Sequence, residues 1–270
     1  MLKVFGGSRT SARVLAPKAA YELWAGTYPA VAHNPLMRAE QEIVQPLLAQ
    51  IRARRALDVG TGSGRYLPLL ASTGAATVVG VDFSLAMLAR VAEARRGEGD
   101  GSPQHLQCEG GSAAKTGLAG LKPCATLSQA TCRAMSICAD ACRLPFRRAA
   151  FDLINASLMV GDVADLAGWS REMARALSCG GHLVYSDFHP SWAQHGWSRT
   201  FRDAGGEVHE IGFHAHSIDD HLTALDESGF HVVAIREPRF KDDTDPVVKA
   251  FRRRWRNPRV IVVFHAVKKR

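Results

Sequence analysis

The chain has 270 residues, of which 46% are hydrophobic and 22% are charged. A chain of this length can bury one large core, so we expect residues 1–270 to form a single domain. No run of about 18 apolar residues occurs, which argues against a transmembrane helix. The net charge of +8 leaves a contact with an anionic partner open.

Residues 1–18 contain basic side chains and no acid, and they lack the apolar centre of a secretory signal. We therefore expect a frayed leader there, followed by helices over residues 19–53. Trp24 and Tyr28 are four positions apart, so a helix would place them on one face. Contact with a ligand and ordinary packing both remain open for these two rings.

A short apolar strand ends in the turn Gly60-Thr61-Gly62-Ser63-Gly64, and a helix follows. Glycines let the backbone turn tightly and let a ligand approach it, and the helix start offers free N–H groups. Such turns hold nucleotide-like cofactors in doubly wound α/β domains. The spacing is neither the dinucleotide G-x-G-x-x-G nor a P-loop. Asp58, within the strand, would face a cation better than a pyrophosphate.

A second strand, residues 77–81, ends in Asp82. A carboxylate at this strand tip can accept hydrogen bonds from both hydroxyls of a ribose. The alternative is that Asp82 only caps the next helix. The pattern Asp-x-Gly-x-Gly-x-Gly, followed by this acid, resembles the class I S-adenosylmethionine (SAM) methyltransferases.

The resemblance continues through residues 138–146, 151–158 and 179–187. It implies a doubly wound α/β fold, Rossmann-like, with a mostly parallel seven-stranded sheet and helices on both faces. The last strand, residues 260–267, would insert antiparallel. SAM would be the cofactor, held by Tyr28, Asp58, Gly60, Thr61, Gly62, Gly64, Asp82, Phe83, Met87, Asp140, Ala141 and Ser157.

Residues 20–29 resemble the opening of small-molecule methyltransferases of the ubiquinone/menaquinone and biotin-pathway type, which implies that residues 19–53 form lid helices over SAM. Residues 97–133 are rich in Gly, Ser, Ala and Thr and show no sustained period. We expect a mobile insertion there. The six cysteines are irregularly spaced, and we expect free thiols, no metal and a cytoplasmic protein.

Histidines concentrate in the last third of the chain. His189 follows the fifth strand, so we expect it at the mouth of the site, either as a catalytic base or as part of the wall. A hairpin over residues 200–217 would turn at Gly205-Gly206 and cap the acceptor. His209, His214 and His216 could share its faces, and we favour a polar cap over a metal site there.

Residues 246–270 contain nine basic side chains and no acid. This basic C-terminal segment is either a solvated face or a docking patch for RNA, an acidic carrier protein or a substrate phosphate. The fourth strand ends in Asn155-Ala156-Ser157-Leu158 rather than the Asn/Asp-Pro-Pro-Tyr/Phe of amino methylases.

The sequence therefore favours SAM-dependent methyl transfer to an oxygen or carbon of a small molecule. An RNA methyltransferase and a catalytically silent SAM-fold scaffold are the alternatives, while the glycine spacing disfavours an NAD-dependent oxidoreductase. No pattern indicates an oligomeric state.

Overall fold

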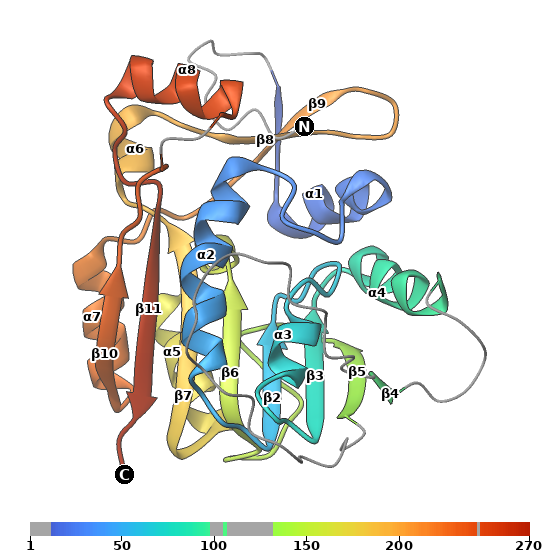
Figure 1. Ribbon diagram of the computed structural model, residues 1–270, viewed down its shortest axis with the longest axis vertical. Helices are drawn as coiled ribbons and strands as arrows, with labels where there is room; N and C mark the ends of the chain where they lie inside the picture. Colours follow the sequence, from blue (N-terminus) through green and yellow to red (C-terminus); the bar gives the residue numbers. More distant parts are fainter. Residues whose placement is uncertain (1–11, 98–104, 107–131, 242–243) are drawn as a thin grey trace, which may run out of the picture.

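The structure is a computed structural model, which describes residues 12–97, 105–106, 132–241 and 244–270. Its main sheet has the strand order β10-β11-β7-β6-β2-β3-β5-β4 (Figure 1). The five central strands run parallel, whereas β11 is antiparallel to both of its neighbours and the short β4 is antiparallel to β5. The strands are β2 (Arg55–Val59), β3 (Thr77–Asp82), β4 (His105–Leu106), β5 (Cys132–Cys138), β6 (Phe151–Ser157), β7 (Leu177–Phe188), β10 (Phe230–Arg236) and β11 (Ile261–Lys268). The predicted seven-stranded, mostly parallel sheet is confirmed, with β4 added at one edge.

Helices cover both faces of this sheet, as predicted. One face packs against α2 (Pro35–Ala49) and α3 (Leu67–Ala71), whereas α8 (Pro246–Trp255) lies beyond the end of the strands in Figure 1. The other face packs against α5 (Leu166–Ala176) and α7 (Ile218–Glu227). The strands between them are mostly runs of fully buried Val, Ile and Leu, as expected for parallel strands covered on both sides.

Strand register brings the sequence motifs together at one edge of the sheet. Val59 pairs with Val81, and Asp58 pairs with Asn155. The glycine turn after β2 therefore lies beside Asp82 at the end of β3 and close to the end of β6. Carboxyl ends of parallel strands are where ligands bind in open α/β sheets.

A small cap lies over this edge (Figure 1). It is built from α1 (Pro17–Trp24) and a three-stranded sheet of β1 (Arg13–Leu15), β9 (Val208–Ile211) and β8 (Arg199–Arg202). Its own hydrophobic cluster contains Leu15, Ala20, Trp24, Phe201 and Ile211. Arg13 to Leu15 pair in parallel with β9, so the expectation of a frayed leader up to residue 18 is wrong for these residues.

The cap hairpin occurs where the sequence predicts it. β8 and β9 are antiparallel, and Gly206 lies in the turn between them with a positive φ. The pairing ends at Ile211, so His214 and His216 lie beyond the hairpin instead of on its faces. His216 Nε2 instead lies 2.8 Å from the Val163 carbonyl oxygen.

The remaining elements are α4 (Leu85–Gly97), α6 (Ser191–His195) and the short 3-10 helices η1 (Ala25–Thr27) and η2 (Val160–Asp162). The expected insertion over residues 97–133 lies mostly outside the described residues, and β5 already begins at Cys132. Among the described residues, no helix is both long enough and apolar enough to cross a membrane.

Candidate functional site

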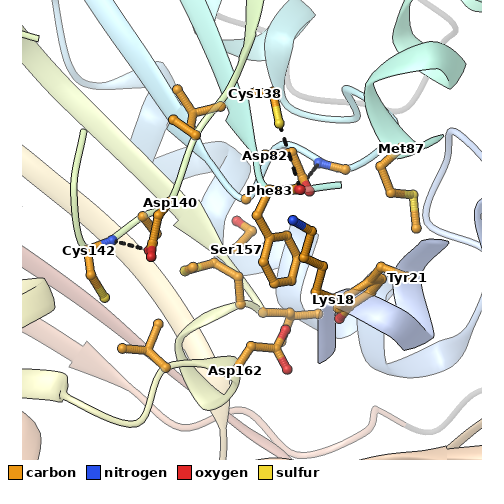
Figure 2. A pocket seen from close by; sticks show the side chains of 18 of the residues that line it. Lys18, Tyr21, Asp82, Phe83, Met87, Cys138, Asp140, Cys142, Ser157 and Asp162 are labelled. Carbon is orange, nitrogen blue, oxygen red and sulfur yellow. Dashed lines mark hydrogen bonds between the residues drawn. The ribbon is translucent and has the colours of Figure 1, made fainter. Parts of the chain in front are cut away.

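A cavity of about 640 Å³ lies between the cap and the carboxyl edge of the sheet (Figure 2). This volume is typical of small-molecule and cofactor sites. Nine of the twelve predicted cofactor residues line it: Tyr28, Gly60, Gly62, Asp82, Phe83, Met87, Asp140, Ala141 and Ser157. Asp58, Thr61 and Gly64 do not line it.

The three glycines of the turn all have positive φ, between +54° and +86°, but they serve different purposes. Gly62 has open space where a Cβ would stand, and it lines the cavity, so a ligand can approach its backbone closely. A Cβ on Gly64 would come within 3.2 to 3.3 Å of Leu67 and Val91. Gly64 is therefore required for packing of the turn on its helices rather than for ligand contact.

Asp58 does not face the cavity, which corrects the expectation that it faces a bound cation. It is 2% exposed. One carboxylate oxygen accepts a hydrogen bond of 2.7 Å from the Thr61 hydroxyl, and the other accepts one of 2.7 Å from the Asn155 side-chain amide. Burial raises the pKa of Asp58 to about 6, against the lowering effect of these two donors. Asp58 thus ties the glycine turn to β6.

Asp82 lies at the end of β3, in the wall of the cavity. One oxygen accepts from the Gly62 N–H at 2.8 Å and the other from the Ser84 N–H at 2.9 Å. A carboxylate has about four acceptor positions, so the two oxygens can still accept from ribose hydroxyls. Burial raises the pKa of Asp82 to about 6, although the backbone donors at Ser84 and Gly62 lower it.

The wall around Asp82 suits an adenosine group. Phe83 and Met87 supply apolar surface, and Asp140 and Ala141 lie beyond the end of β5. The Asp140 carboxylate accepts from the Cys142 N–H at 2.8 Å, which fixes its loop. Carboxylates, an open glycine backbone and an apolar wall together fit the hydroxyls, the adenine and the positive charge of SAM.

The cap contributes the opposite wall. Tyr28 lines the cavity, whereas Trp24 packs in the cap with its ring stacked on Phe201 at 5.1 Å between centroids. Of the two readings for these aromatics, Trp24 is a packing residue and Tyr28 reaches the cavity. Tyr21 and Lys18 of α1 also line the cavity (Figure 2).

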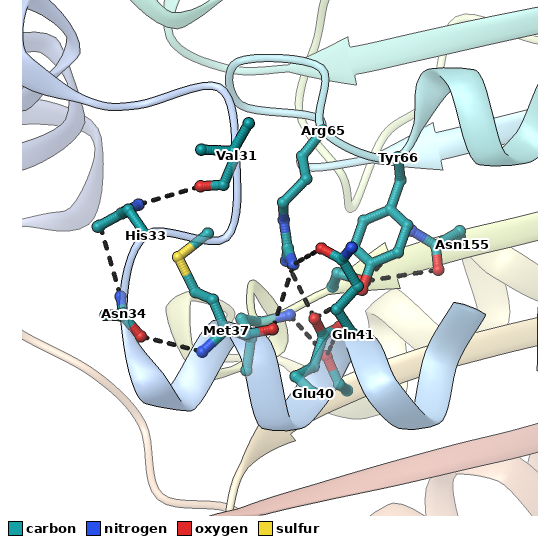
Figure 3. A network of polar contacts seen from close by, with 12 residues as sticks. Val31, His33, Asn34, Met37, Glu40, Gln41, Arg65, Tyr66 and Asn155 are labelled. Carbon is teal, nitrogen blue, oxygen red and sulfur yellow. Dashed lines mark hydrogen bonds and ion pairs between the residues drawn. The ribbon is translucent and has the colours of Figure 1, made fainter. Parts of the chain in front are cut away.

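A buried polar network supports the turn from behind (Figure 3). Glu40 of α2 is fully buried. Its carboxylate accepts from the Arg65 guanidinium at 3.1 Å, from the Tyr66 hydroxyl at 2.6 Å and from the Ser186 hydroxyl at 2.9 Å. Because Glu40 connects α2 to the glycine turn and to β7, it holds this helix on the sheet, which does not support the expectation that α2 is a lid.

His189 does not line the cavity, so the structure gives no support to its expected place at the mouth of the site. Its Nε2 lies 2.9 Å from Glu237 Oε1, and its Nδ1 accepts from the Ser191 N–H at 3.1 Å. Both ring nitrogens are thus engaged beside β7. Burial lowers the pKa of His189, although Glu237 raises it.

Sequence reasoning missed five charged or polar residues of the cavity: Lys18, Tyr21, Arg65, Asp162 and Asp165. The position of Arg65 directly after the glycine turn was a usable signal. Asp162 follows β6 by a few residues, at the carboxyl edge where ligands bind. Tyr21 lies in the segment 20–29, whose resemblance implied a place over SAM, whereas no local pattern places Lys18 at the cavity.

One group of potential metal ligands occurs in the described part of the chain. Asp203, Glu207 and His209 of the cap hairpin have ligand atoms within 4.8 Å of one another. Asp203 already accepts from the Glu207 N–H and interacts with His209 Nε2, each at 2.9 Å. These contacts within the hairpin turn explain why the three side chains lie close together, without a metal ion.

Comparisons with known proteins agree with this geometry. Residues 57–185 match the family model of a methyltransferase domain. A SAM-dependent methyltransferase from Mesorhizobium loti is 22% identical with a TM-score of 0.60, covering 85% of this chain and 98% of that chain. No curated protein matches the sequence.

Two further structures share the fold. The methyltransferase solved with the Haloferax volcanii Trm112 activator is 17% identical with a TM-score of 0.62, covering 94% of this chain and 97% of that chain. Geranyl diphosphate C-methyltransferase from Streptomyces coelicolor is 16% identical with a TM-score of 0.55, covering 86% of this chain and 79% of that chain.

The fold and the cavity define an α/β protein that binds an adenosine-containing cofactor at the carboxyl edge of its sheet. With the family match over residues 57–185, they identify a class I SAM-dependent methyltransferase. The chain is therefore an enzyme, and SAM is its cofactor, as the sequence predicted.

Proposed function

We propose that this enzyme transfers the methyl group of SAM to an oxygen or a carbon of a small organic molecule. The observation that carries the proposal is the position of the cavity, which the cap covers with Lys18, Tyr21 and Tyr28. Cofactor and acceptor must share about 640 Å³, which favours an acceptor small enough to enter between cap and sheet.

The end of β6 favours oxygen or carbon over nitrogen as the methylated atom. Asn155 donates to Asp58 at 2.7 Å and is 0% exposed, so its amide serves the glycine turn and is not presented to an acceptor. The Streptomyces coelicolor protein methylates a carbon of geranyl diphosphate on the same fold. A fold alone does not set the substrate, so this neighbour only illustrates that carbon methylation is compatible with the architecture.

A methyl-transfer assay tests the proposal. The purified protein is incubated with radiolabelled SAM and either the ultrafiltered small-molecule fraction of a cell extract or its RNA. We expect label in a small molecule, on an oxygen or carbon. Label found in RNA, or on a nitrogen, would contradict the proposal.

The basic C-terminal segment favours RNA or an acidic carrier protein as a second candidate partner. The last turn of α8 contains Arg252, Arg253 and Arg254, and the Arg254 guanidinium lies 5.0 Å from the centre of the Trp255 ring. Such a basic surface can bind phosphates, while the Trp255 ring itself packs against His195 and Trp197. The methyltransferase solved with the Trm112 activator shows that a protein of this fold can assemble with a partner chain.

Replacing Arg252, Arg253 and Arg254 with Gln separates the two candidates. For a neutral small acceptor we expect the rate of methyl transfer to stay unchanged. Binding to RNA would instead weaken and lose part of its salt dependence. The control replaces the exposed Arg147, Arg148 and Arg171, which removes the same charge elsewhere. Equal effects of both triple variants would mean that only net charge matters.

A cytoplasmic location belongs to the same proposal. Cys132, Cys138, Cys142 and Cys179, the described cysteines, are all free thiols. Free thiols are typical of reducing compartments.

A further inference from the structure

A buried ionic group occupies the end of the cavity away from Met87 and Cys138 (Figure 2). Asp162, the last residue of η2, lines the cavity and forms an ion pair with Arg199 of β8. Their side chains are 7% and 2% exposed. Tyr21 of α1 also interacts with the Asp162 carboxyl and lowers its pKa. Three separate elements thus meet at one carboxylate.

Arg199 is held in place independently of Asp162. It donates to the Gly212 carbonyl at 2.9 Å, and its guanidinium lies 4.9 Å from the centre of the Phe188 ring. A guanidinium remains protonated at any working pH. It therefore compensates the buried charge of Asp162 and limits the movement of this carboxylate.

Burial raises the pKa of two acidic groups that line the cavity, Asp162 and Tyr21. The pKa of Asp162 is raised, with Arg199 lowering it in part. The pKa of Tyr21 is raised well above its usual value by burial and by Asp162. Tyr21 is thus a neutral donor, and Asp162 is a better proton acceptor than an exposed carboxylate.

The cofactor wall leaves this end of the cavity to the acceptor. Asp82, Phe83 and Met87 would hold the ribose and adenine, and Figure 2 shows Asp82 and Met87 in the upper part of the cavity and Asp162 at the bottom, with the Phe83 ring between them. Asp162 is not among the residues that we assign to contacts with adenosine. Its carboxylate therefore has no role in the cofactor wall described above.

We infer that Asp162 is the general base of the reaction and that the acceptor is a phenol or an enolisable carbon acid. The inference rests on the proposed function. The acceptor oxygen or carbon bonds to the methyl carbon, and the methyl–sulfur bond breaks with its electron pair remaining on sulfur. The acceptor proton passes to Asp162 and then to water. Tyr21 and Arg199 are positioning residues.

The acidity of the acceptor follows from the base. A phenol has a pKa near 10. Burial raises the pKa of a carboxyl group toward that value, which favours transfer of the phenol proton to the carboxylate. An aliphatic alcohol is far less acidic, so a carboxylate gives little help with its proton. An acidic C–H between two carbonyl groups lies in the same range as a phenol. These two classes therefore fit the site better than alcohols do.

Asp162→Asn tests the inference with two probes, 4-methylphenol and 4-nitrophenol, assayed at a pH where only 4-nitrophenol is ionised. We expect methylation of 4-methylphenol to slow about 100- to 10,000-fold, as for loss of a general base. Methylation of the 4-nitrophenolate should change only a few-fold, because no proton has to leave. Asp226→Asn, an exposed carboxylate that pairs with Lys269, is the control and should change neither rate.

Several results would overturn the inference. If methylation of both probes slows equally, Asp162 has a structural role. If SAM affinity falls by the same factor as the rate, Asp162 is a cofactor ligand. If Asp162→Asn does not fold, the double variant with Arg199→Met removes both charges and is tested in its place. If the native protein methylates neither probe nor a cyclic 1,3-diketone, the acceptor class is wrong. Failure of the proposed function would appear separately, as methyl transfer to RNA in the extract assay.

Discussion

Replacing Asp82 with alanine is expected to weaken SAM binding about 10- to 1,000-fold. Hydrogen bonds to a charged acceptor contribute about 1.5–3 kcal/mol each, and an affinity change of tenfold corresponds to about 1.4 kcal/mol. Asp82→Asn should fall between the native protein and Asp82→Ala, since an amide has one acceptor oxygen. Calorimetric titration with SAM measures the effect.

The structure also predicts a loss of stability in Asp82→Ala, because the carboxylate accepts from the backbone of Gly62 and Ser84. The control is Asp245→Ala. Asp245 caps α8 by accepting from the Val247 N–H at 2.8 Å and lies outside the residues that line the cavity. It should lower the melting temperature and leave SAM affinity unchanged. Unchanged SAM affinity in a folded Asp82→Ala variant would contradict the cofactor assignment.

The pH dependence of SAM binding follows from the same group. The pKa of Asp82 is raised to about 6 by burial, and the cationic cofactor favours the ionised carboxylate. Affinity should therefore be highest above this pKa and fall as the pH drops through about 6. Asp58 has a pKa of about 6 as well. A flatter pH profile in Asp82→Asn would assign the effect to Asp82.

Local patterns in the sequence predicted the parts of the fold that neighbouring residues determine. The glycine turn, the strand ending in Asp82 and the hairpin around Gly206 all depend on residues close together in the chain. The antiparallel last strand came from the resemblance to methyltransferases instead. The pattern of apolar and polar residues in β11 does not distinguish it from a parallel buried strand.

Contacts between distant residues could not be predicted in this way. The position of Asp58 before the glycine turn suggested a carboxylate that faces a ligand. In the structure, Asn155, 97 positions later in the chain, donates a hydrogen bond to one of its oxygens. The strand β1 forms only because β9 lies beside it. The ion pair of Asp162 with Arg199 likewise joins η2 to β8, whose sequences show no motif.

The largest effect on stability is expected from Glu40, which sequence reasoning placed in a lid. Glu40→Ala leaves the Arg65 guanidinium buried without its carboxylate and removes the acceptor of the Tyr66 and Ser186 hydroxyls. Arg65 is 11% exposed. Removing one partner of a buried ion pair costs about 3–5 kcal/mol, so we expect the free energy of unfolding to fall by that amount.

Glu42→Ala is the matched control, two positions along the same helix. Glu42 pairs with Lys241 at the surface, where the two side chains are 50% and 77% exposed. Exposed pairs contribute about 0–1 kcal/mol, so this variant should be close to the native protein. Urea denaturation of both variants measures the difference, with the slope of the transition showing whether the folded state stays compact. Equal stabilities of Glu40→Ala and Glu42→Ala would mean that only the apolar face of α2 holds it on the sheet. The helix could then move as the lid that the sequence suggested.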